Sequence, residues 1–573
     1  MSKKFRSVVA VSLLATMLLA SCGGNTDTGS GSENTSGSNS ATETTGESSG
    51  SASGGVEVSP AGVLPIVNEP VEVHLAIKKY GQVEDYVNNS YTKYIEENTG
   101  LKLKVDIYPE AEANQKMEVL IASGSKLPDA FASDAFFGTN KPATILRHAQ
   151  NGYFIELDDL IEEYGVNFKE MSEKVSNPLF KEMITSPDGH IYCLPVYNEQ
   201  TSNEHSLRAY INQTWLDNLN LEMPTTTEEL ETVLQAFVSQ DPNGNGQKDE
   251  IGMMGGGSWH QMAQDWLMNS FIYDDGETRW MVNDGKLDVP YNKEEWREGL
   301  RYINSLVSQG LFDPLTFTQD GAAFKSIATA GDRNSLGVIC TAGMGQLFSA
   351  SMSDRKGEYA PLDPLVGPEG VQWAAHYPVN PTPAFVITKD CENPEAVFRM
   401  ADFMMSEESS VFSRFGEKGV DWVEPEEGEV ALGEAWGAEP TLKPILIWGG
   451  SSHSSHWNDV TPHILLSKYT DGQVWNGDPT DAEYMIAIST ATMLDKTPEE
   501  TVTTIIYTEE ENSAIADIKT TLETYVDESM ARFATGDLDL DKDWDSYLEE
   551  LEAIGLSQYI EISQTAYDRM LGK

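Results

Sequence analysis

The stretch from residue 71 to residue 131 alternates between strand and helix patterns, and this alternation constrains the fold more than any other feature. Every second residue is apolar in 71–77 and again in 101–108, which is typical of half-buried strands. Helical segments separate these two strands from each other and from a short apolar run at 127–131. The order strand, helix, strand, helix, strand predicts a parallel α/β sheet.

The length of the chain requires more than one core. With 573 residues the chain exceeds what a single hydrophobic core supports, so we expect two or more lobes. Ligands of open α/β sheets bind beside the carboxyl ends of the strands, which places the loop around Asp134 near a candidate site. We take Asp134 and Glu199 as candidate polar partners for a ligand.

Charge and cysteine content exclude several classes of protein. The chain has 38 Lys and Arg against 91 Asp and Glu, a formal net charge of −53. Such a surface repels phosphate backbones and anionic lipid, so we expect no nucleic-acid partner and no electrostatic membrane docking. Cys193, Cys340 and Cys391 are isolated, and no CxxC pair occurs. A zinc site or a disulfide framework is therefore not expected, and we interpret these cysteines as buried small apolar residues.

The N-terminus has the features of an export signal. Three basic residues within the first six positions precede an apolar run at 8–20, which is too short to span a bilayer as a mature helix. The run ends in Leu-Ala-Ser-Cys at 19–22, which resembles the bacterial lipobox. We therefore expect residues 1–21 to be a signal peptide and Cys22 to carry lipid on the extracytoplasmic face of the cell membrane. The alternative is an ordinary cleaved signal with an incidental cysteine.

A polar linker follows the cysteine. Residues 23–55 contain only Gly, Ser, Thr, Asn, Ala, Asp and Glu, none of which can anchor a core. We predict that 22–70 is a disordered tether, and about thirty such residues span roughly 30 Å by flexible-chain scaling. The folded part is expected to begin near Val71.

The run 241–250, DPNGNGQKDE, combines the chemistry of a turn with that of a cation site. Side-chain oxygens stand at the alternate positions Asp241, Asn243 and Asn245, and Gly246 follows where a calcium loop turns sharply. A hard cation takes six to eight oxygens at about 2.3–2.6 Å, and alternate residues of a short loop supply them well. The match to the EF-hand pattern ends there, because the twelfth position is Gly252 and not Glu.

Two readings of this run remain open. Glu250 can take the role of the missing glutamate two residues early, with Asp249 beside it and a backbone carbonyl from Gln247. In that case the loop holds a structural calcium ion at the end of the amphipathic helix predicted after residue 225. The alternative is a polar Asn-Gly turn, which uses the same residues without a cation.

Several longer runs resemble one family of proteins. These are INQTWLDNL at 211–219, PTTTE at 224–228 and the 241–250 run, with further similarity at 188–192, 298–304, 310–314, 543–547 and 564–569. Together with the lipobox they resemble the family 1 extracellular solute-binding lipoproteins of ABC importers. The resemblance extends from about Val71 to the C-terminus.

The resemblance implies an α/β, two-lobed periplasmic-binding-protein-like fold with several hinge crossings. Lobe 1 is then expected to comprise 71–190 and 376–445, and lobe 2 to comprise 191–375 and 446–573, which carries the loop. Members with such a loop resemble oligosaccharide binders that hold calcium there. The implied calcium ligands are Asp241, Asn243, Asn245, Gln247 through its backbone, Asp249 and Glu250. The implied partners are an oligosaccharide or other small solute and the permease subunits of an ABC importer, with the protein itself a monomer.

Aromatic residues in loops are the candidates for contact with a sugar, because ring faces match the C–H side of a pyranose or furanose. Trp259, Trp373 and Trp457 lie in loops rich in Gly, Ser or Pro, and Tyr377 is close to one of them. Structural packing is the alternative for each. Trp215, by contrast, falls within a helical pattern and is expected in the core.

Two other functions on this sequence were weighed. A secreted glycoside hydrolase needs two carboxylates facing one bond, and no pair stands out among 91 acidic residues. The motifs HExxH and the P-loop are absent, so we do not expect an enzyme. A peptide- or signal-binding lipoprotein on the same fold remains an alternative to the carbohydrate binder.

The lipobox generates the first prediction. The variant Cys22→Ala removes the acceptor of the lipid and should release the protein from the membrane fraction. Fractionation of cells followed by detection of the protein measures this. A Cys22→Ala protein that still sediments with membranes would contradict the anchor.

Overall fold

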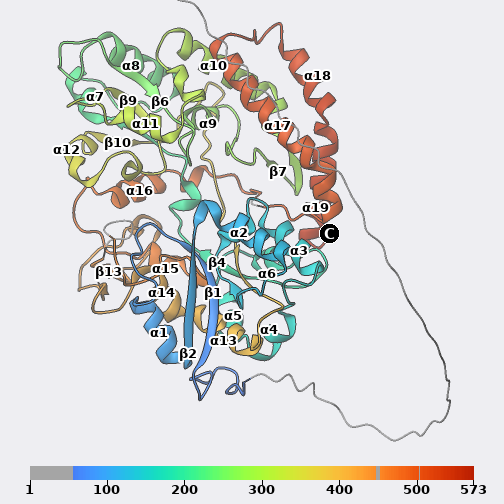
Figure 1. The fold of residues 1–573 in the computed structure, drawn as a ribbon. Helices are drawn as coiled ribbons and strands as arrows, with labels where there is room; N and C mark the ends of the chain where they lie inside the picture. Colours follow the sequence, from blue (N-terminus) through green and yellow to red (C-terminus); the bar gives the residue numbers. More distant parts are fainter. Residues whose placement is uncertain (1–55, 447–451, 503) are drawn as a thin grey trace, which may run out of the picture. The chain divides into compact units, whose positions relative to one another are not determined.

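The computed structural model describes residues 56–446, 452–502 and 504–573, so Cys22 and the signal peptide lie outside the described residues. Two separate sheets organise the described part of the chain (Figure 1). The first has six strands in the order β14-β4-β11-β3-β1-β2, and the second has four in the order β10-β5-β9-β6. We call the first sheet with the helices packed on it lobe 1, and the second sheet with its helices lobe 2.

Lobe 1 begins with the alternating segment. Its strands are β1 (Val71–Lys79), β2 (Leu101–Pro109), β3 (Ala130–Phe131), β4 (Leu194–Asn198), β11 (Thr382–Ile387) and β14 (His463–Leu465). Its helices are α1 (Ser90–Thr99), α2 (Glu110–Ser123), α3 (Lys141–Gln150), α4 (Asp158–Tyr164), α5 (Val166–Ser172), α6 (Phe180–Ile184), α13 (Pro394–Met404), α14 (Glu407–Phe415) and α15 (Ser467–Thr470).

The predicted parallel unit is confirmed. Strand β1 pairs in parallel with β2 from Val71↔Leu101 onward, and with β3 on its other side. Helix α1 begins at the side-chain cap Asn89 and ends at Gly100, whose φ of 78° lies in the left-handed region that favours glycine. The carboxyl ends of the three strands therefore meet at one edge of the sheet.

The remaining strands of this sheet come from distant parts of the chain. Strand β11 runs antiparallel between β3 and β4, and β14 runs parallel to β4 with His463 opposite Val196. The predicted lobe boundaries at residues 191 and 446 put β4 and β14 in lobe 2, whereas their backbone pairing puts both in lobe 1. No local pattern marks β14, which has only three residues.

Lobe 2 contains the mixed sheet and a helical layer. Its strands are β5 (Ala209–Asn212), β6 (Ile251–Met254), β9 (Leu336–Cys340) and β10 (Tyr359–Leu362). Its helices are α7 (Gln213–Leu219), α8 (Thr227–Ser239), α9 (Ala263–Met268), α10 (Glu294–Ser308), α11 (Gly321–Ala328), α12 (Ser353–Lys356), α16 (Ala482–Ala491), α17 (Glu509–Thr535), α18 (Trp544–Ile554) and α19 (Leu556–Met570). The two-stranded ribbon of β7 (Met281–Asn283) and β8 (Lys286–Asp288) also belongs to lobe 2. The second ribbon, β12 (Trp422–Val423) with β13 (Lys443–Pro444), lies between α14 and β14 in the sequence and packs on them in lobe 1.

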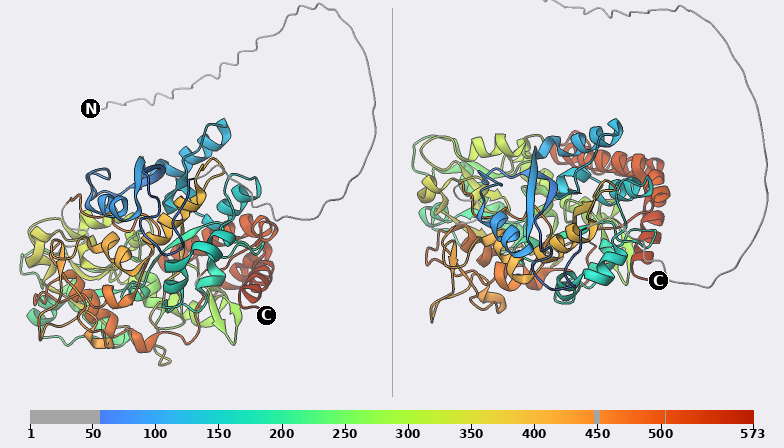
Figure 2. Two further views of the ribbon diagram at one scale, coloured as in Figure 1. Left: turned by 90° about the horizontal axis from the view of Figure 1, so that it is seen from below. Right: turned by 60° about the horizontal axis from the view of Figure 1, so that its bottom comes forward.

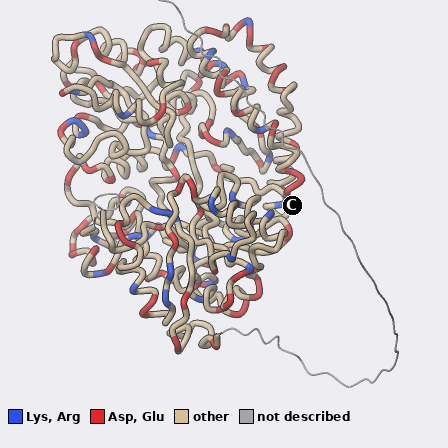
Figure 3. The backbone as a smooth tube through the Cα atoms, in the orientation of Figure 1, with Lys and Arg blue, Asp and Glu red and all other residues tan. Residues whose placement is uncertain are grey.

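The C-terminal helices form one face of lobe 2. Helix α17 has a capping box between Thr508 and Glu511 and ends at Gly536. Its apolar residues Leu522 and Val526 join the core that contains Trp296 of α10. Figure 2 shows these helices, coloured red, packed side by side. The acidic surplus is spread over both lobes rather than concentrated in one patch (Figure 3).

Three segments of chain cross between the lobes: crossing A (199–208), crossing B (363–381) and crossing C (471–481). Asp471 of crossing C accepts hydrogen bonds from the backbone nitrogen and hydroxyl of Thr201 in crossing A, at 3.2 and 2.6 Å. The backbone carbonyl of Glu204 in crossing A accepts a hydrogen bond from the backbone nitrogen of Tyr377 at 2.8 Å. The carboxylate of Glu204 accepts one from the backbone nitrogen of Val379 at 3.3 Å. The crossings therefore form one hydrogen-bonded hinge.

Glu204 makes this hinge sensitive to pH. Burial, with a smaller effect of the nearby carboxylates Asp471 and Glu199, raises the pKa of its carboxyl group from 4.5 to about 7. The folded state thus binds this proton more tightly than the unfolded chain. The free energy of unfolding contributed by Glu204 should therefore decrease as the pH rises from 4.5 to about 7, and stay low above that window.

The variant Glu204→Gln tests this sign. The neutral amide keeps an acceptor for Val379 and has no charge to desolvate. We expect it to be more stable than the parent protein at pH 8 and equally stable at pH 4, measured by thermal unfolding across the pH range. The exposed Glu222→Gln serves as a matched control that should leave the profile unchanged. Parallel profiles for parent and Glu204→Gln would contradict the role.

Candidate functional site

The loop from Asp241 to Glu250 folds around the carboxylate of its first residue. Asp241 accepts hydrogen bonds from the backbone nitrogens of Asn245 and Gly246, at 3.0 and 2.8 Å. The amide oxygen of Asn245 accepts from the backbone nitrogen of Gln247 at 2.7 Å. Gly246 has a φ of 76°, which favours glycine at the position predicted for the sharp turn. The side-chain oxygens of Asp241 and Asn245 thus stabilise the turn by accepting backbone hydrogen bonds.

The chemistry of this loop fits a hard cation. Both carboxylate oxygens of Glu250 are buried without a hydrogen-bond partner. Burial raises the pKa of Glu250, and the charges of Asp249 and Asp241 raise it further. A buried carboxylate without a partner is costly, and a bound cation would remove that cost. No cluster of three or more His, Cys, Asp or Glu suited to a metal occurs in the described part of the chain, so amide and backbone oxygens must complete any such site.

The loop is attached to lobe 2 alone. The guanidinium of Arg333 donates to the carbonyl of Asn243, and the side chain of Asn218 donates to the carbonyl of Pro242 at 2.8 Å. The amide of Asn243 also contacts the carbonyl of Asn334 at 3.3 Å. All these partners belong to the same lobe, which indicates a structural rather than a ligand-contacting loop.

A cluster of rings lies where lobe 2 meets crossing B. The ring of His260 packs between Trp259 and Tyr377, with centroids at 4.3 and 4.2 Å. Trp259 is 50% exposed, whereas His260 is buried at 2%. Tyr377 donates its hydroxyl hydrogen bond to the carbonyl of Asp275 at 2.5 Å. The structure thus brings together two of the residues predicted for the ligand, Trp259 and Tyr377, on a rigid support.

His260 is held neutral in this cluster. Burial lowers the pKa of its imidazole to about 3, and the positive charge of Arg208 adds to the effect. Its Nδ1 atom is buried without a hydrogen bond, and the nearest carboxylate oxygen, on Glu277, is 3.7 Å away. The backbone of His260 has a φ of 51°, which is strained for a residue other than glycine.

Trp373 and Asp134 occupy positions compatible with their predicted roles. Trp373 lies on crossing B, is 37% exposed, and donates its backbone hydrogen bond to Asn269. Asp134 follows β3 at the carboxyl edge of the first sheet, as expected. Its carboxylate is paired with Lys78 at 2.9 Å and lies 3.7 Å from Lys141. A ligand would therefore meet a neutralised acid there rather than a free charge.

Trp457 and Glu199 do not fit the roles predicted for them. Trp457 has no exposed surface; its ring packs edge-on against Tyr91, and its Nε1 donates to Thr92 at 3.0 Å. Glu199 is buried, and its carboxylate accepts from the backbone nitrogens of Ser176 and Ser467. Each residue therefore supports lobe 1 internally and has no surface to offer a solute.

A charged group near Trp457 was missed by the sequence analysis. Arg414 of α14 is paired with Asp459 at 2.5 Å. The other carboxylate oxygen of Asp459 is buried without a hydrogen bond, as is the hydroxyl of Thr461. Asn458 and Asp459 have φ values of 50° and 60°. Asn and Asp adopt a positive φ more readily than most other residues. The dipeptide Asn-Asp was therefore the signal in the sequence for a turn at this position.

Charges of the two lobes approach each other at this group. Tyr80, which follows β1, has a pKa raised by burial and by the charge of Asp459. Glu483 at the start of α16 in lobe 2 is exposed, yet burial by surrounding protein raises its pKa, while Arg414 and Arg208 lower it. Arg414 of lobe 1 thus acts electrostatically on a carboxylate of lobe 2.

A two-lobed α/β protein with unsatisfied polar groups and an exposed indole between its lobes has the architecture of a solute receptor. Residues 80–410 match the family model of the bacterial extracellular solute-binding proteins, and the chain belongs to this family. The predicted family resemblance and the predicted fold class are confirmed.

The chain is similar to a protein of Streptococcus pneumoniae serotype 4, the fructooligosaccharide ABC transporter substrate-binding protein FusA. The two are 28% identical over 496 residues, which cover 83% of this chain and 86% of FusA. The structure of FusA in complex with kestose has a TM-score of 0.69 at 26% identity and covers 88% of this chain and 100% of that one. A FusA EF-hand mutant in complex with fructo-nystose matches with the same TM-score, identity and coverage.

A further solved structure shares the fold. The HMO-binding, ABC-transporter-associated solute-binding protein from Bifidobacterium longum infantis has a TM-score of 0.70 at 21% identity and covers 87% of this chain and 99% of that one. The family and these relatives are binding proteins. Among the described residues no helix is both long and apolar enough to cross a membrane.

Proposed function

We propose that this protein captures an uncharged oligosaccharide between its lobes and delivers it to the permease subunits of an ABC importer. The observation that carries the proposal is the half-exposed indole of Trp259, supported by the buried His260–Tyr377 pair beside a hinge crossing. The similarity to FusA, a fructooligosaccharide receptor by name, supports the same class of ligand.

The chemistry of the site suits a sugar. A ring face held in place offers apolar area to the C–H groups of a sugar at low entropic cost. The pair Arg414–Asp459, with one buried oxygen still lacking a partner, offers donors and an acceptor for hydroxyl groups. The net charge of −53 disfavours anionic saccharides such as uronides. We therefore assign a neutral ligand and give none of these residues a catalytic role.

Closure of the lobes would couple capture to delivery. Ligand groups bound to both lobes favour the closed arrangement, which shifts the population of conformers toward it. The hinge formed by crossings A, B and C provides the axis of such a motion. We further propose that the monomer is held by lipid on Cys22 at the extracytoplasmic face of the membrane, where the importer receives the solute.

A panel of solutes tests the proposal. Kestose, maltotriose, cellotriose and trigalacturonic acid are compared by thermal shift, and the best binder by small-angle scattering. We expect stabilisation by a neutral sugar without its cleavage, together with contraction of the protein. Cleavage would indicate an enzyme, and a shift produced only by peptides would indicate the alternative receptor class.

Substitution of the platform tests the location of the site. Trp259→Ala removes the exposed indole and should weaken sugar binding by roughly 1–3 kcal/mol, the scale of burying one large apolar side chain. Tyr153→Ala is a matched control. Tyr153 lies near the amino end of β3, away from the edge of the sheet where the carboxyl ends of the strands meet. Unchanged affinity in both Trp259→Ala and Trp373→Ala would show that the site lies elsewhere.

We also propose that the loop 241–250 holds one calcium ion. The residues that would hold it are Asp241, Asn243, Asn245, Gln247 through its backbone, Asp249 and Glu250. The orphaned carboxylate of Glu250 supports this, as does the existence of an EF-hand in the related FusA. When bound, the ion would neutralise the carboxylates among these residues and fix the end of α8 against the rest of lobe 2.

Removal of the ion should lower the stability of lobe 2. A ligand bound only by the folded state contributes about 2.7 kcal/mol at a hundredfold excess over its Kd. A chelator should therefore lower the melting temperature, and Asp241→Ala should give the same loss and abolish the response to chelator. Magnesium should replace calcium poorly, because it demands tighter octahedral geometry.

The same experiment separates the two roles of the loop. Sugar binding at low temperature should survive chelation, since the loop contacts lobe 2 alone. Loss of sugar binding with unchanged stability would place the ion in the ligand site instead. A melting curve that ignores chelator, with no calcium found by metal analysis, would show that the run is only a turn.

A further inference from the structure

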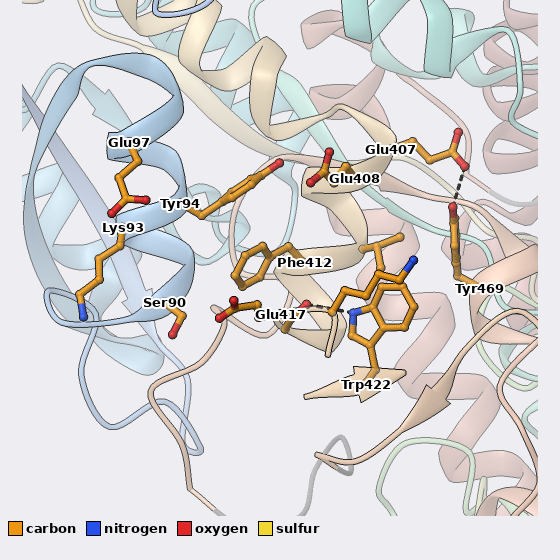
Figure 4. Close-up of a pocket in the computed structure, with 13 residues that line it drawn as sticks. Ser90, Lys93, Tyr94, Glu97, Glu407, Glu408, Phe412, Glu417, Trp422 and Tyr469 are labelled. Atoms are coloured by element: carbon orange, nitrogen blue, oxygen red, sulfur yellow. Dashed lines mark hydrogen bonds between the residues drawn. The ribbon is translucent and has the colours of Figure 1, made fainter. Parts of the chain in front are cut away.

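One cavity lies within lobe 1, apart from the residues proposed for the cleft. Its volume is about 870 Å³, and side chains of α1 line one side while α14, β12 and the end of α15 line the other (Figure 4). Four aromatic residues contribute to its walls: Tyr94, Phe412, Trp422 and Tyr469. None of the residues discussed for the cleft, such as Trp259 or Tyr377, takes part.

The rings of this cavity are held in fixed positions. Tyr94 packs against Phe412 with centroids at 4.8 Å. Trp422 donates its Nε1 hydrogen bond to the carbonyl of Gly416 at 3.1 Å, and Tyr469 donates its hydroxyl to Glu407 at 2.7 Å. Rings anchored in this way offer their exposed surface to a ligand without a further loss of conformational entropy.

The wall that carries Trp422 depends on one glycine. Gly416 has a φ of 79°, and a Cβ there would lie 2.4 Å from the carboxylate of Asp421. That carboxylate accepts from the backbone nitrogen of Glu417 at 2.7 Å and from the hydroxyl of Ser455. Hydrogen bonds therefore attach this turn to the segment that precedes Trp457. The wall of the cavity is thus an ordered part of lobe 1.

Two of the six charged side chains that line the cavity are paired within the protein. Glu407 contacts Lys174 at 3.1 Å and Lys468, and hydrogen bonds from Lys468, Tyr469 and Lys174 outweigh its burial and lower its pKa to about 2. Lys418 is paired with Glu424 at 2.5 Å. The other four lining charges make no ion pair within the described part of the chain: Lys93, Glu97, Glu408 and Glu417. What remains for a ligand is aromatic surface, carboxylates without an ion pair and an ammonium group.

These groups suit a polyhydroxylated ligand better than a cation. Lys418 lies over the ring of Trp422 at 5.5 Å, and Lys468 lies over that of Tyr469 at 5.0 Å. The protein's own ammonium groups thus already occupy the positions that an organic cation would seek. Free acceptors and a donor around ring faces match the hydroxyl and C–H groups of a sugar, in a volume typical of small-molecule sites.

We propose that this cavity is a second carbohydrate-binding site, formed entirely by lobe 1 from Tyr94, Phe412 and Trp422 with Lys93, Glu97 and Glu417. Because lobe 1 supplies every group, occupation of this site does not depend on lobe closure and does not drive it. The protein can then hold a saccharide, or one end of a longer chain, in either arrangement of its lobes. This goes beyond capture in the cleft and does not rest on it.

The experiment measures stoichiometry and contraction in parallel. Kestose, maltotriose and cellotriose are titrated calorimetrically to millimolar concentration, and small-angle scattering follows the same samples. We expect two sites for the parent protein with at least one of these sugars. Trp422→Ala should weaken the second site by roughly tenfold or more, the effect expected for loss of an aromatic contact, and leave the contraction unchanged.

Further variants keep the test sharp. Trp259→Ala should do the reverse of Trp422→Ala, since it weakens the site that drives contraction and leaves the lobe 1 site intact. Glu97 and Glu417 are exposed, so their replacement should not disturb the core. The variants Glu97→Ala and Glu417→Ala should each weaken the second site several-fold. Trp422→Phe keeps a ring and should retain most of the affinity.

The outcomes distinguish the two proposals. A single site in the parent protein, unaffected by Trp422→Ala, Glu97→Ala and Glu417→Ala, overturns the second site and leaves the cleft proposal standing. Binding that depends on Trp422 without any contraction overturns capture in the cleft and leaves the second site standing. Contraction that disappears in Trp422→Ala would show that the cavity is coupled to closure and would overturn its independence.

Discussion

The hydrogen bonds among the three crossing segments are the constraint on which the rest of the structure depends. Asp471 joins crossing C to crossing A, and Glu204 joins crossing A to crossing B. Polar side chains form both joints, and an interface of this kind lets the lobes move relative to each other more readily than a large apolar one would. A hinge of this kind permits a change of angle while each lobe keeps its own core.

The hinge also explains where the polar groups lacking partners are found. Asp459 and Thr461 lie just before β14, and His260 lies just before α9, so each stands where a lobe faces the other. Three residues other than glycine on these loops have a positive φ: His260, Asn458 and Asp459. Strain and unsatisfied hydrogen bonds cost stability, and a fold retains them where a ligand makes use of them. Arg208 Nε in crossing A and Asn380 Oδ1 in crossing B are also buried without a hydrogen bond, so the described crossings share part of this pattern.

What could be predicted from the sequence was local. The alternation in β1 and β2, the cap and apolar face of α8, and the stop of α17 at Gly536 follow from residues close together in the chain. Strands β11 and β14 could not be found in this way, because their partners lie up to 267 positions away and a three-residue strand has no periodicity. Likewise the sequence does not distinguish a loop tryptophan that is half exposed, as Trp259 is, from one that is fully buried, as Trp457 is. Burial is a property of tertiary packing, and Glu199 shows the same limit for a carboxylate.

The cleft and the lobe 1 cavity illustrate how one type of chemistry acquires different consequences from topology. The proposed cleft site takes Trp259 from lobe 2 and Arg414 from lobe 1, whereas the proposed cavity site takes Tyr94 and Trp422 from lobe 1 alone. Binding energy can shift an equilibrium between two arrangements only by the difference in affinity for them. A ligand that spans the lobes has such a difference, and a ligand enclosed by one lobe has none. The position of the chain crossings, rather than the identity of the side chains, therefore decides which site can signal occupancy to a transporter.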